Sequence, residues 1–306
     1  MVVIPESESP ASALHVEGPP IMKGSSMQNL DRLGYRDKRV VVTGGSSGMG
    51  EQVARILGEL GARVHIVDIQ PPKVAHESFQ QCDLSDFDQV RATAAALKSV
   101  APIDFLFPCA GLPPHIKGPM YCMRVNYIGT RLFIEEVLPS MRDGGGIALI
   151  SSDAAMGWQA KTAQCLEMLA ISDPDEAYAW CEADPEKRVR DAYTSSKEML
   201  VVYVANKAVE LGNERRIRLN AIGPCPTRTA FMDEQEKLLP DGFLDAWPYP
   251  SLGRIAAAEE QAWPLVLLNS PLNGAVTGSF LYTDQGFASG VFTGAINPSF
   301  MTGEAA

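Results

Sequence analysis

The sequence predicts an α/β fold in which a doubly wound parallel sheet of about seven strands carries helices on both faces. Short apolar runs rich in β-branched residues alternate with helical patterns along the chain, which is the order that crossover connections in a parallel sheet require. The runs are apolar almost throughout, as expected for strands that are buried on both sides. A glycine-rich turn separates the first run from the first helical pattern.

The predicted strands lie at residues 40–42, 64–67, 78–82, 103–108, 146–150, 217–222 and 280–282. Helical patterns lie at residues 52–60, 87–98, 121–141, 192–211 and 257–268. A chain of 306 residues is long enough for one well-packed domain of this kind with an excursion. We therefore predict a single domain over residues 37–306.

Two segments break the alternation. Residues 1–36 are rich in Pro, Ser and Glu and lack a basic segment followed by an apolar core, which predicts a flexible N-terminal extension rather than a secretion signal. An ordered arm on a neighbouring subunit is the alternative. Residues 153–191 separate the fifth strand from the helix at 192, and a structureless loop of that length is unusual. Two short helical patterns there predict a helical insertion at about 157–190.

Composition excludes several classes of partner. The net charge is −11, so no basic surface for nucleic acid is expected. No apolar run is long enough to span a bilayer. The six cysteines contain no CxxC pair and the four histidines show no metal-ligand spacing. We therefore expect a cytoplasmic protein with reduced thiols, no metal site, and neither nucleic acid nor membrane as a partner.

The first apolar run leads into Thr43-Gly44-Gly45-Ser46-Ser47-Gly48-Met49-Gly50, which opens an amphipathic helix. Glycines permit a tight turn and a close approach of the backbone to a phosphate, and the helix N-terminus supplies free N–H groups. An ordinary strand–helix turn is the alternative. We expect a dinucleotide here, in contact with Gly44, Ser46, Ser47, Gly48 and Met49.

Acidic residues end the next two strands. A carboxylate at Asp68 would accept hydrogen bonds from the adenosine ribose and repel a 2′-phosphate. Because no Arg or Lys lies in the glycine turn or in residues 69–72, this favours NAD over NADP. Asp83 would bind the adenine amino group beside the N–H of Leu84. A turn role for Asp68 and a helix-capping role for Asp83 are the alternatives.

Tyr193 and Lys197 lie four residues apart, on one face of a predicted helix. A phenol has a pKa of about 10, and a nearby cation would lower it, so that the tyrosine could act as an acid or base. The same spacing recurs at Tyr203 and Lys207, about 80° around the helix. Small residues inside the first pair leave room for a cofactor. We assign the chemistry to the first pair and packing to the second.

Further residues complete the pattern formed by the glycine turn, the two acidic residues and the tyrosine–lysine pair. They are Cys109-Ala110-Gly111, Asn126, Ser151-Ser152, Asn220 and Pro224. Over residues 39–286 the chain resembles the short-chain dehydrogenases/reductases, and among them the bacterial 3α-hydroxysteroid dehydrogenase/carbonyl reductases. The resemblance implies a Rossmann-type domain and an enzyme that uses NAD(P).

The resemblance implies four catalytic residues. Tyr193 would be the general acid/base, and Lys197 would bind the nicotinamide ribose and lower the pKa of the tyrosine. Ser152, rather than Ser151, would bind the substrate oxygen, and Asn126 would hold a water in a proton relay to the lysine. Further implied cofactor contacts are Cys109, Ala110, Gly111, Pro224, Thr227 and Thr229.

The chain departs from the usual family pattern at three places. Cys109 stands where an asparagine is usual, and Cys225 stands where a glycine usually follows Pro224. Cys225 lacks the freedom of glycine at positive φ. The separation of Ser152 and Tyr193 is 41 residues, which is longer than usual but similar to that of the bacterial subgroup.

Aromatic and methionine side chains predict the substrate pocket, since they suit a flat apolar ligand. They are Phe231, Met232, Phe243, Leu244, Trp247 and Tyr249 in the loop after Pro226, and Met156, Trp158, Met168 and Trp180 in the insertion. The alternative is that they pack the insertion on the core or form a subunit contact.

We therefore expect an NAD-dependent oxidoreductase that interconverts a secondary alcohol and a ketone on a bulky apolar substrate such as a hydroxysteroid. A sugar, polyol or aryl alcohol dehydrogenase of the same family is one alternative, and a catalytically idle NAD-binding scaffold is another. The resemblance also implies a homodimer or homotetramer, with the insertion next to a helix that the family often uses for tetramer assembly.

Overall fold

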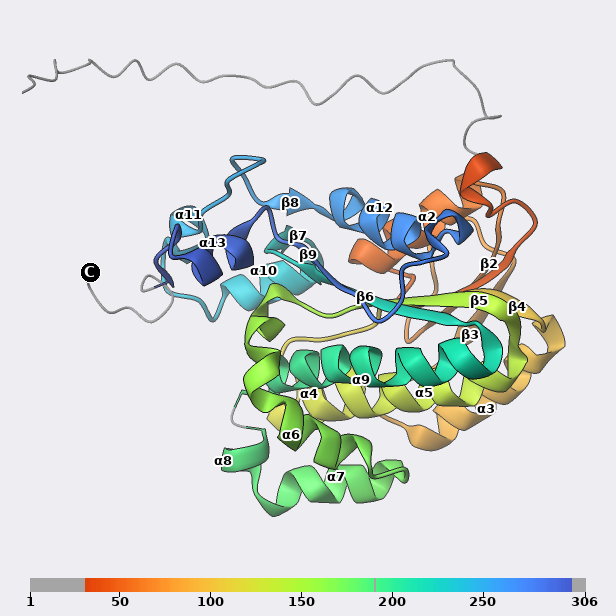
Figure 1. Ribbon diagram of the computed structural model, residues 1–306, viewed down its shortest axis with the longest axis horizontal. Coiled ribbons are helices and arrows are strands. Elements are labelled where there is room, and N and C mark those ends of the chain that lie inside the picture. The colour runs from red at the N-terminus through yellow and green to blue at the C-terminus, as the bar shows by residue number, and fades with distance from the viewer. Residues whose placement is uncertain (1–30, 190, 299–306) are drawn as a thin grey trace, which may run out of the picture.

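The computed structural model of the protein describes residues 31–189 and 191–298 (Figure 1). Its main sheet has seven parallel strands in the order β3-β2-β1-β4-β5-β6-β9, which confirms the predicted fold class. The strands are β1 (Arg39–Thr43), β2 (Arg63–Asp68), β3 (Ser78–Gln81), β4 (Ile103–Pro108), β5 (Met141–Ile150), β6 (Arg218–Pro224) and β9 (Phe280–Thr283). The chain reverses its direction of winding between β1 and β4, so their carboxyl ends open a crevice at the edge of the sheet.

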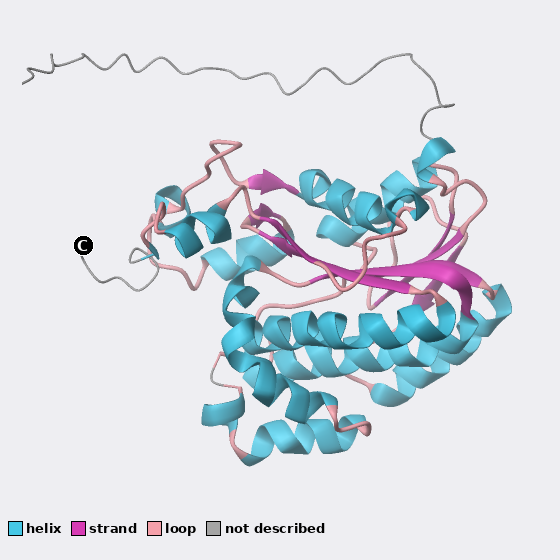
Figure 2. Ribbon diagram, viewed as in Figure 1, coloured by secondary structure: helices cyan, strands magenta, loops and turns pink. Residues whose placement is uncertain are grey.

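Helices cover both faces of the sheet (Figures 1 and 2). On one face lie α2 (Gly48–Glu59) and α12 (Ala258–Asn269), and on the other lie α3 (Phe87–Leu97), α5 (Thr130–Val137) and α9 (Ala192–Arg215). Val40 and Val42 join the core under α2 and α12, whereas Val41 joins the core on the opposite face. Successive strand residues point to opposite faces, which is why this run is apolar at every position.

The helix predicted over 121–141 is interrupted. The structure has α4 (Pro119–Met123), a π-helical turn η3 (Arg124–Gly129) and α5, and Met141 already begins β5. Where the π turn ends, the hydroxyl of Thr130, the first residue of α5, donates to the carbonyl of Val125 at 3.1 Å. A π turn adds one residue to a helical turn, but nearly every residue from Cys122 to Ile134 is buried, so no change in a one-sided apolar pattern marks the break.

The segment predicted as an insertion forms three helices, α6 (Trp158–Leu169), α7 (Pro174–Ala183) and α8 (Pro185–Arg188). The α6 helix packs against α9 (Figure 1), and Met168 and Cys181 are fully buried in the main core. The guanidinium of Arg131, on α5, donates to the carbonyls of Met168 and Ile171 at 3.4 and 2.9 Å, just where α6 ends. These contacts make the insertion part of the core rather than an appended arm.

Most of the predicted N-terminal extension, residues 1–30, lies outside the described residues. The remainder contains a short helical turn, η1 (Asp31–Leu33), followed by Tyr35, which is fully buried. The Tyr35 hydroxyl donates to the carbonyl of Val266 at 2.6 Å, and the Ser270 hydroxyl donates to that of Leu33 at 2.9 Å. The packed structure therefore includes Tyr35, two residues before the predicted start of the domain.

Short elements gather beyond the carboxyl ends of the main strands (Figure 1). They are the parallel pair β7 (Thr227–Arg228) and β8 (Ala256–Ala257), and the helices α10 (Ala230–Glu236), α11 (Phe243–Ala246) and α13 (Phe287–Thr293). Sequence patterns did not predict these helices, because each has only two turns or fewer and shows no amphipathic repeat.

Candidate active site

A cavity of about 430 Å³ opens at the carboxyl ends of the parallel strands, where ligands bind in sheets of this type. It brings together most of the predicted site residues from segments far apart in the sequence. Those that line it are Gly44, Ser47, Gly48, Met49, Asp68, Asp83, Leu84, Cys109, Ala110, Gly111, Ser152, Tyr193, Lys197, Pro224, Thr227 and Thr229. Ser46 and Asn126 are not among the described residues that line it.

The glycine turn has the geometry that a pyrophosphate needs. Gly44 has a φ of +67°, and a Cβ added there would lie 2.7 Å from the backbone of Ala110. Ser47 begins α2 in an extended conformation and its side chain caps none of the helix N–H groups. The first N–H groups of a helix have no partner within the helix and carry partial positive charge. The turn therefore fits the phosphates of a dinucleotide.

Asp68 ties the glycine turn to the end of β2. Its two carboxylate oxygens accept hydrogen bonds from the backbone N–H groups of Ser46 and Gln70, at 3.0 and 3.1 Å. The Ser46 hydroxyl donates to the carbonyl of Gln70 at 2.6 Å, which explains why Ser46 does not line the cavity. An ionised carboxylate has about four acceptor positions, so Asp68 retains capacity for ribose hydroxyls.

Asp83 also lines the cavity. Its carboxylate accepts from the backbone N–H of Ser85 at 2.8 Å and from the Tyr121 hydroxyl at 3.2 Å. The helix that follows is capped instead by Asp86, which accepts from two backbone N–H groups of its first turn. The alternative capping role for Asp83 is therefore not seen.

Tyr193 and Lys197 meet Ser152 at the centre of the cavity. The Lys197 Nζ lies 5.6 Å from the centroid of the Tyr193 ring and donates to the carbonyl of Ile150, at the end of β5, at 3.0 Å. The neighbouring serines have different partners: the Ser151 hydroxyl donates to the carbonyl of Lys197 at 2.9 Å, whereas Ser152 hydrogen-bonds with Tyr193. Ser151 thus fixes α9 to the sheet and leaves Ser152 to face the phenol.

Burial has the largest effect on the pKa of both Tyr193 and Lys197. It raises the pKa of Tyr193, although that residue is only half-buried as a whole, and the hydrogen bond with Ser152 acts in the opposite direction. Burial lowers the pKa of Lys197 to about 8. The sequence analysis expects a lowered pKa for the Tyr193 phenol. Among the effects that the protein itself exerts, burial is the largest, and it raises that pKa instead.

Asn126 lies in the π turn and is fully buried. Its Oδ1 accepts from the N–H of Leu112 and its Nδ2 donates to the carbonyl of the same residue, both at 2.9 Å. A Cβ added at Gly111 would lie 3.5 Å from both Asn126 Oδ1 and Lys197 Nζ. The Asn126 side chain thus fixes the turn after β4 close to the lysine, and the helix that carries it is distorted into a π turn at this residue.

The other end of the cavity is apolar. It is lined by Phe231, Met232, Phe243, Leu244 and Trp247 from the loop after Pro226, and by Met156. The rings of Tyr193 and Phe231 lie 5.7 Å apart between centroids. Of the remaining residues expected here, Tyr249 is not a lining residue, and Trp158, Met168 and Trp180 pack in or against the core. The insertion therefore contributes to the core more than to the pocket.

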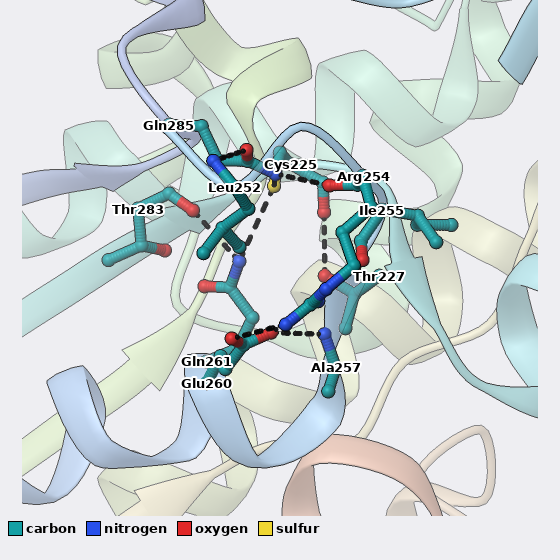
Figure 3. A network of polar contacts seen from close by, with 10 residues as sticks. All are labelled: Cys225, Thr227, Leu252, Arg254, Ile255, Ala257, Glu260, Gln261, Thr283 and Gln285. Carbon is teal, nitrogen blue, oxygen red and sulfur yellow. Dashed lines mark hydrogen bonds and ion pairs between the residues drawn. The ribbon is translucent and has the colours of Figure 1, made fainter. Parts of the chain in front are cut away.

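The loop that carries Cys225 is fastened by a polar network (Figure 3). The side-chain amides of Gln261 and Gln285 donate to the Cys225 Sγ at 3.5 and 3.6 Å. The same amides donate to the carbonyls of Thr283 and Arg254 at 2.8 and 3.0 Å. Cys225 does not adopt a positive φ, so the loss of the usual glycine is tolerated without strain, and burial raises the pKa of its thiol to about 11.

Asp153, which the sequence analysis did not single out, also lines the cavity. Its side chain is buried directly after Ser152, where β5 ends. The signal in the sequence that could have identified Asp153 is its position directly after an apolar strand and a pair of serines.

No group of three His, Cys, Asp or Glu side chains in the described ranges could hold a metal ion. Across the same ranges, no helix combines the length and apolar character that crossing a bilayer requires.

Comparison with known proteins identifies relatives of this chain. A family model described as short chain dehydrogenase matches residues 38–163, and one described as enoyl-(acyl carrier protein) reductase matches residues 185–288. The chain is 30% identical over 253 residues to a coniferyl-alcohol dehydrogenase of Pseudomonas sp., covering 83% of this chain and 97% of that one. It is 29% identical over 251 residues to a 3α-hydroxysteroid dehydrogenase/carbonyl reductase of Comamonas testosteroni, covering 81% of this chain and 95% of that one.

A solved structure shows the same fold. A 3α-hydroxysteroid dehydrogenase from Pseudomonas sp., in complex with NADH, matches 85% of this chain and 100% of its own with a TM-score of 0.70 at 22% identity. Together with the sequence relatives, this likeness establishes that the chain belongs to the short-chain dehydrogenase/reductase family of oxidoreductases.

Proposed function

We propose that this protein is an NAD-dependent dehydrogenase/reductase that interconverts a secondary alcohol and a ketone on a bulky apolar substrate. The observation that carries the proposal is the meeting of Tyr193, Lys197 and Ser152 between the glycine turn and an apolar pocket. A nicotinamide ring bound there would supply or accept the hydride. In oxidation, Tyr193 takes the hydroxyl proton, Ser152 orients the substrate oxygen, and Lys197 holds the cofactor ribose.

The substrate class follows from the pocket and the relatives. Aromatic and methionine side chains around Tyr193 suit a flat, apolar skeleton, and one relative is named for a 3α-hydroxysteroid. A hydroxysteroid is the first candidate. An aryl alcohol is the second, because a relative of similar identity is named for coniferyl alcohol.

A substrate panel tests the activity. The purified protein is mixed with NAD and, in separate reactions, a 3α-hydroxysteroid, coniferyl alcohol, borneol and a polyol, and the absorbance of reduced nicotinamide is recorded. We expect turnover of the steroid or the aryl alcohol and none of the polyol. A protein that binds NAD but oxidises no alcohol would be the idle scaffold. Preferential polyol turnover would assign it to the sugar and polyol class.

The cofactor preference is tested at Asp68. Its carboxylate stands where a 2′-phosphate would be repelled, so we expect the wild type to use NAD in preference to NADP. Asp68→Asn retains one acceptor oxygen but removes the charge. Loss of charged hydrogen bonds, each about 1.5–3 kcal/mol, should lower kcat/KM for NAD by about 10–100-fold and raise it for NADP. An unchanged ratio between the two cofactors would assign Asp68 a purely structural role.

We infer a homodimer or homotetramer. The strand β9 is the last strand of the main sheet and carries the exposed side chain of Leu281, and an edge strand with an exposed apolar side chain favours pairing with another chain. Because α6 packs on α9, we expect association through the β9 edge rather than through α9. Light scattering should give a dimer for the wild type and a smaller species for Leu281→Lys. A tetramer unaffected by that substitution would contradict this inference.

We also propose a cytoplasmic location with reduced thiols. All six cysteines are free, and five of them are buried. A thiol titration of the natively expressed protein after unfolding should find all six reduced. Oxidised pairs would argue for another compartment.

A further inference from the structure

Tyr121 lines the cavity together with Asp83, and the proposed chemistry does not use it. It lies on α4, and its hydroxyl donates to Asp83 Oδ2 at 3.2 Å. The same hydroxyl accepts from Lys117 Nζ and from Ser85 Oγ, each also at 3.2 Å. An ammonium can only donate and a carboxylate can only accept. The single proton of the Tyr121 hydroxyl is therefore directed to Asp83.

Tyr121 also holds the ammonium of Lys117, whose side chain is exposed. The Lys117 Nζ lies 4.4 Å from the centroid of the Tyr121 ring, within the range of a cation–π contact. The hydrogen bond to Tyr121 raises the pKa of Lys117, and the charge of Asp83 acts in the same direction. Lys117 has a φ of +58°, which residues other than glycine rarely adopt. Lys117, Tyr121 and Asp83 form a chain of contacts that leads from the surface into the cavity.

The two carboxylate oxygens of Asp83 are held by different groups. Oδ1 accepts from the backbone N–H of Ser85 at 2.8 Å, and Oδ2 accepts from the Tyr121 hydroxyl. Rotation of the carboxylate would break at least one of these bonds, so its orientation is fixed. A carboxylate has about four acceptor positions, and these two bonds occupy only two of them. Asp83 can therefore accept from a donor in the cavity.

The amino group of adenine is a donor of this kind. Hypoxanthine carries a carbonyl oxygen in place of that amino group, and a carbonyl oxygen can only accept. Two acceptors that face each other leave both groups unpaired, and a site built to hydrogen-bond one ligand rejects an analogue that lacks the matching group. Hydrogen bonds weaken steeply away from a linear geometry, so this selection depends on how the carboxylate is oriented.

We propose that Tyr121 is a positioning residue that orients the Asp83 carboxylate, so that the site selects a dinucleotide carrying adenine over one carrying hypoxanthine. Lys117 supports this role because its ammonium directs the Tyr121 proton to Asp83. The inference rests on the proposed use of NAD and on the adenine contact expected for Asp83. It concerns binding of the cofactor and does not depend on the identity of the alcohol.

Equilibrium binding to the full-length protein tests the proposal without turnover. Dissociation constants for NAD and for nicotinamide hypoxanthine dinucleotide are measured by quenching of protein fluorescence, and the wild type should bind NAD more tightly. Tyr121→Phe keeps the ring and removes the hydroxyl. Its Kd for NAD should rise by about 3–10-fold, the effect of one hydrogen bond, while its Kd for the hypoxanthine dinucleotide changes less. An unchanged ratio of the two constants would overturn the proposal.

A double-mutant cycle separates positioning from a direct contact between Tyr121 and the cofactor. Asp83→Ala removes the carboxylate that Tyr121 is proposed to orient. In this background Tyr121→Phe should have no further effect on the Kd for NAD, because coupled residues are not additive. An equal effect of Tyr121→Phe with and without Asp83 would show that it acts independently of the carboxylate, which contradicts the proposal.

Tyr178→Phe is the matched control. The Tyr178 ring packs against the guanidinium of Arg124 at 4.9 Å, and it does not line the cavity. This variant should keep both dissociation constants of the wild type. A wild type that binds neither NAD nor NADH would overturn the proposed function as well. A wild type that binds NAD but does not distinguish it from the hypoxanthine dinucleotide would overturn only this inference.

Lys117→Met covers the case in which Tyr121→Phe does not fold. The substitution changes an exposed side chain and leaves the Tyr121 hydroxyl in place. Without the ammonium, the Tyr121 proton is less firmly directed to Asp83, so the preference for NAD should fall, but by less than in Tyr121→Phe. In that case, a preference equal to that of the wild type would refute the proposal.

Discussion

The helix α9 carries the same tyrosine–lysine spacing twice, in two very different environments. Tyr193 and Lys197 line the cavity, and Lys197 is 4% exposed with its Nζ bound to the carbonyl of Ile150. Tyr203 is 1% exposed within the core, and Lys207 lies at the surface in an ion pair with Glu210 at 2.8 Å. Neither member of the second pair lines the cavity.

The difference arises from helix geometry. Ten residues at about 100° each place the second pair about 80° around the helix and two to three turns further along. The first pair therefore emerges where β5 ends and the cavity opens, while the second tyrosine points into the layer shared with α5. The chemistry proposed for the first pair therefore depends on Ser152 and the cavity beside it as well as on the spacing.

The largest expected effect is on turnover. Tyr193→Phe removes the proposed acid/base hydroxyl, and the loss of such a group lowers kcat by about 10²–10⁴-fold. Binding of NAD, followed by quenching of protein fluorescence, should remain. The control Tyr203→Phe removes the same atom from the other pair and should retain wild-type kcat. Equal losses in both variants would mean that the spacing does not separate the two roles.

The next largest effect is on stability, and here the substitution at Tyr203 should have the larger effect. Tyr203→Ala leaves a cavity in the core and should lower the free energy of unfolding by about 3–5 kcal/mol. Tyr193→Ala removes a half-buried side chain that faces the cavity, so its cost should be smaller. Urea denaturation followed by circular dichroism measures both. A larger loss for Tyr193→Ala would contradict the packing role assigned to Tyr203.

The smallest effect is a pH dependence of stability. Burial lowers the pKa of Lys197 to about 8, whereas the unfolded chain retains that proton up to a pKa of about 10.4. Between these values the unfolded state binds more protons, so stability should rise with pH by about 2 kcal/mol across the window. Lys197→Met should lose this rise, and Lys207→Met should retain it. A rise that persists in Lys197→Met would assign it to another group.

Local patterns predicted much of the site. The glycine turn and the Tyr193–Lys197 pair are short local spacings, and every contact residue predicted in them except Ser46 lines the cavity. The exception arises from a contact outside the turn, since the hydroxyl of Ser46 donates to the carbonyl of Gln70, 24 residues further along the chain.

Other features could not be predicted, because they depend on contacts between distant segments. Asp153 lies next to Asp284 only because β5 and β9 flank the same strand, β6. Tyr35 belongs to the core through a hydrogen bond with Val266, 231 residues away. The π turn at Asn126 leaves no sign in the sequence because the helix is buried on nearly all sides there.

The sequence by itself determined the parallel α/β sheet, the glycine turn and the candidate tyrosine and lysine, because each depends on a repeat or spacing within one segment. The tertiary structure decided which serine faces the phenol, placed the aromatic loop rather than the insertion around the pocket, and left one oxygen of Asp153 buried without a partner. These outcomes depend on burial and on distances across the sheet, and neither quantity exists until the chain has folded.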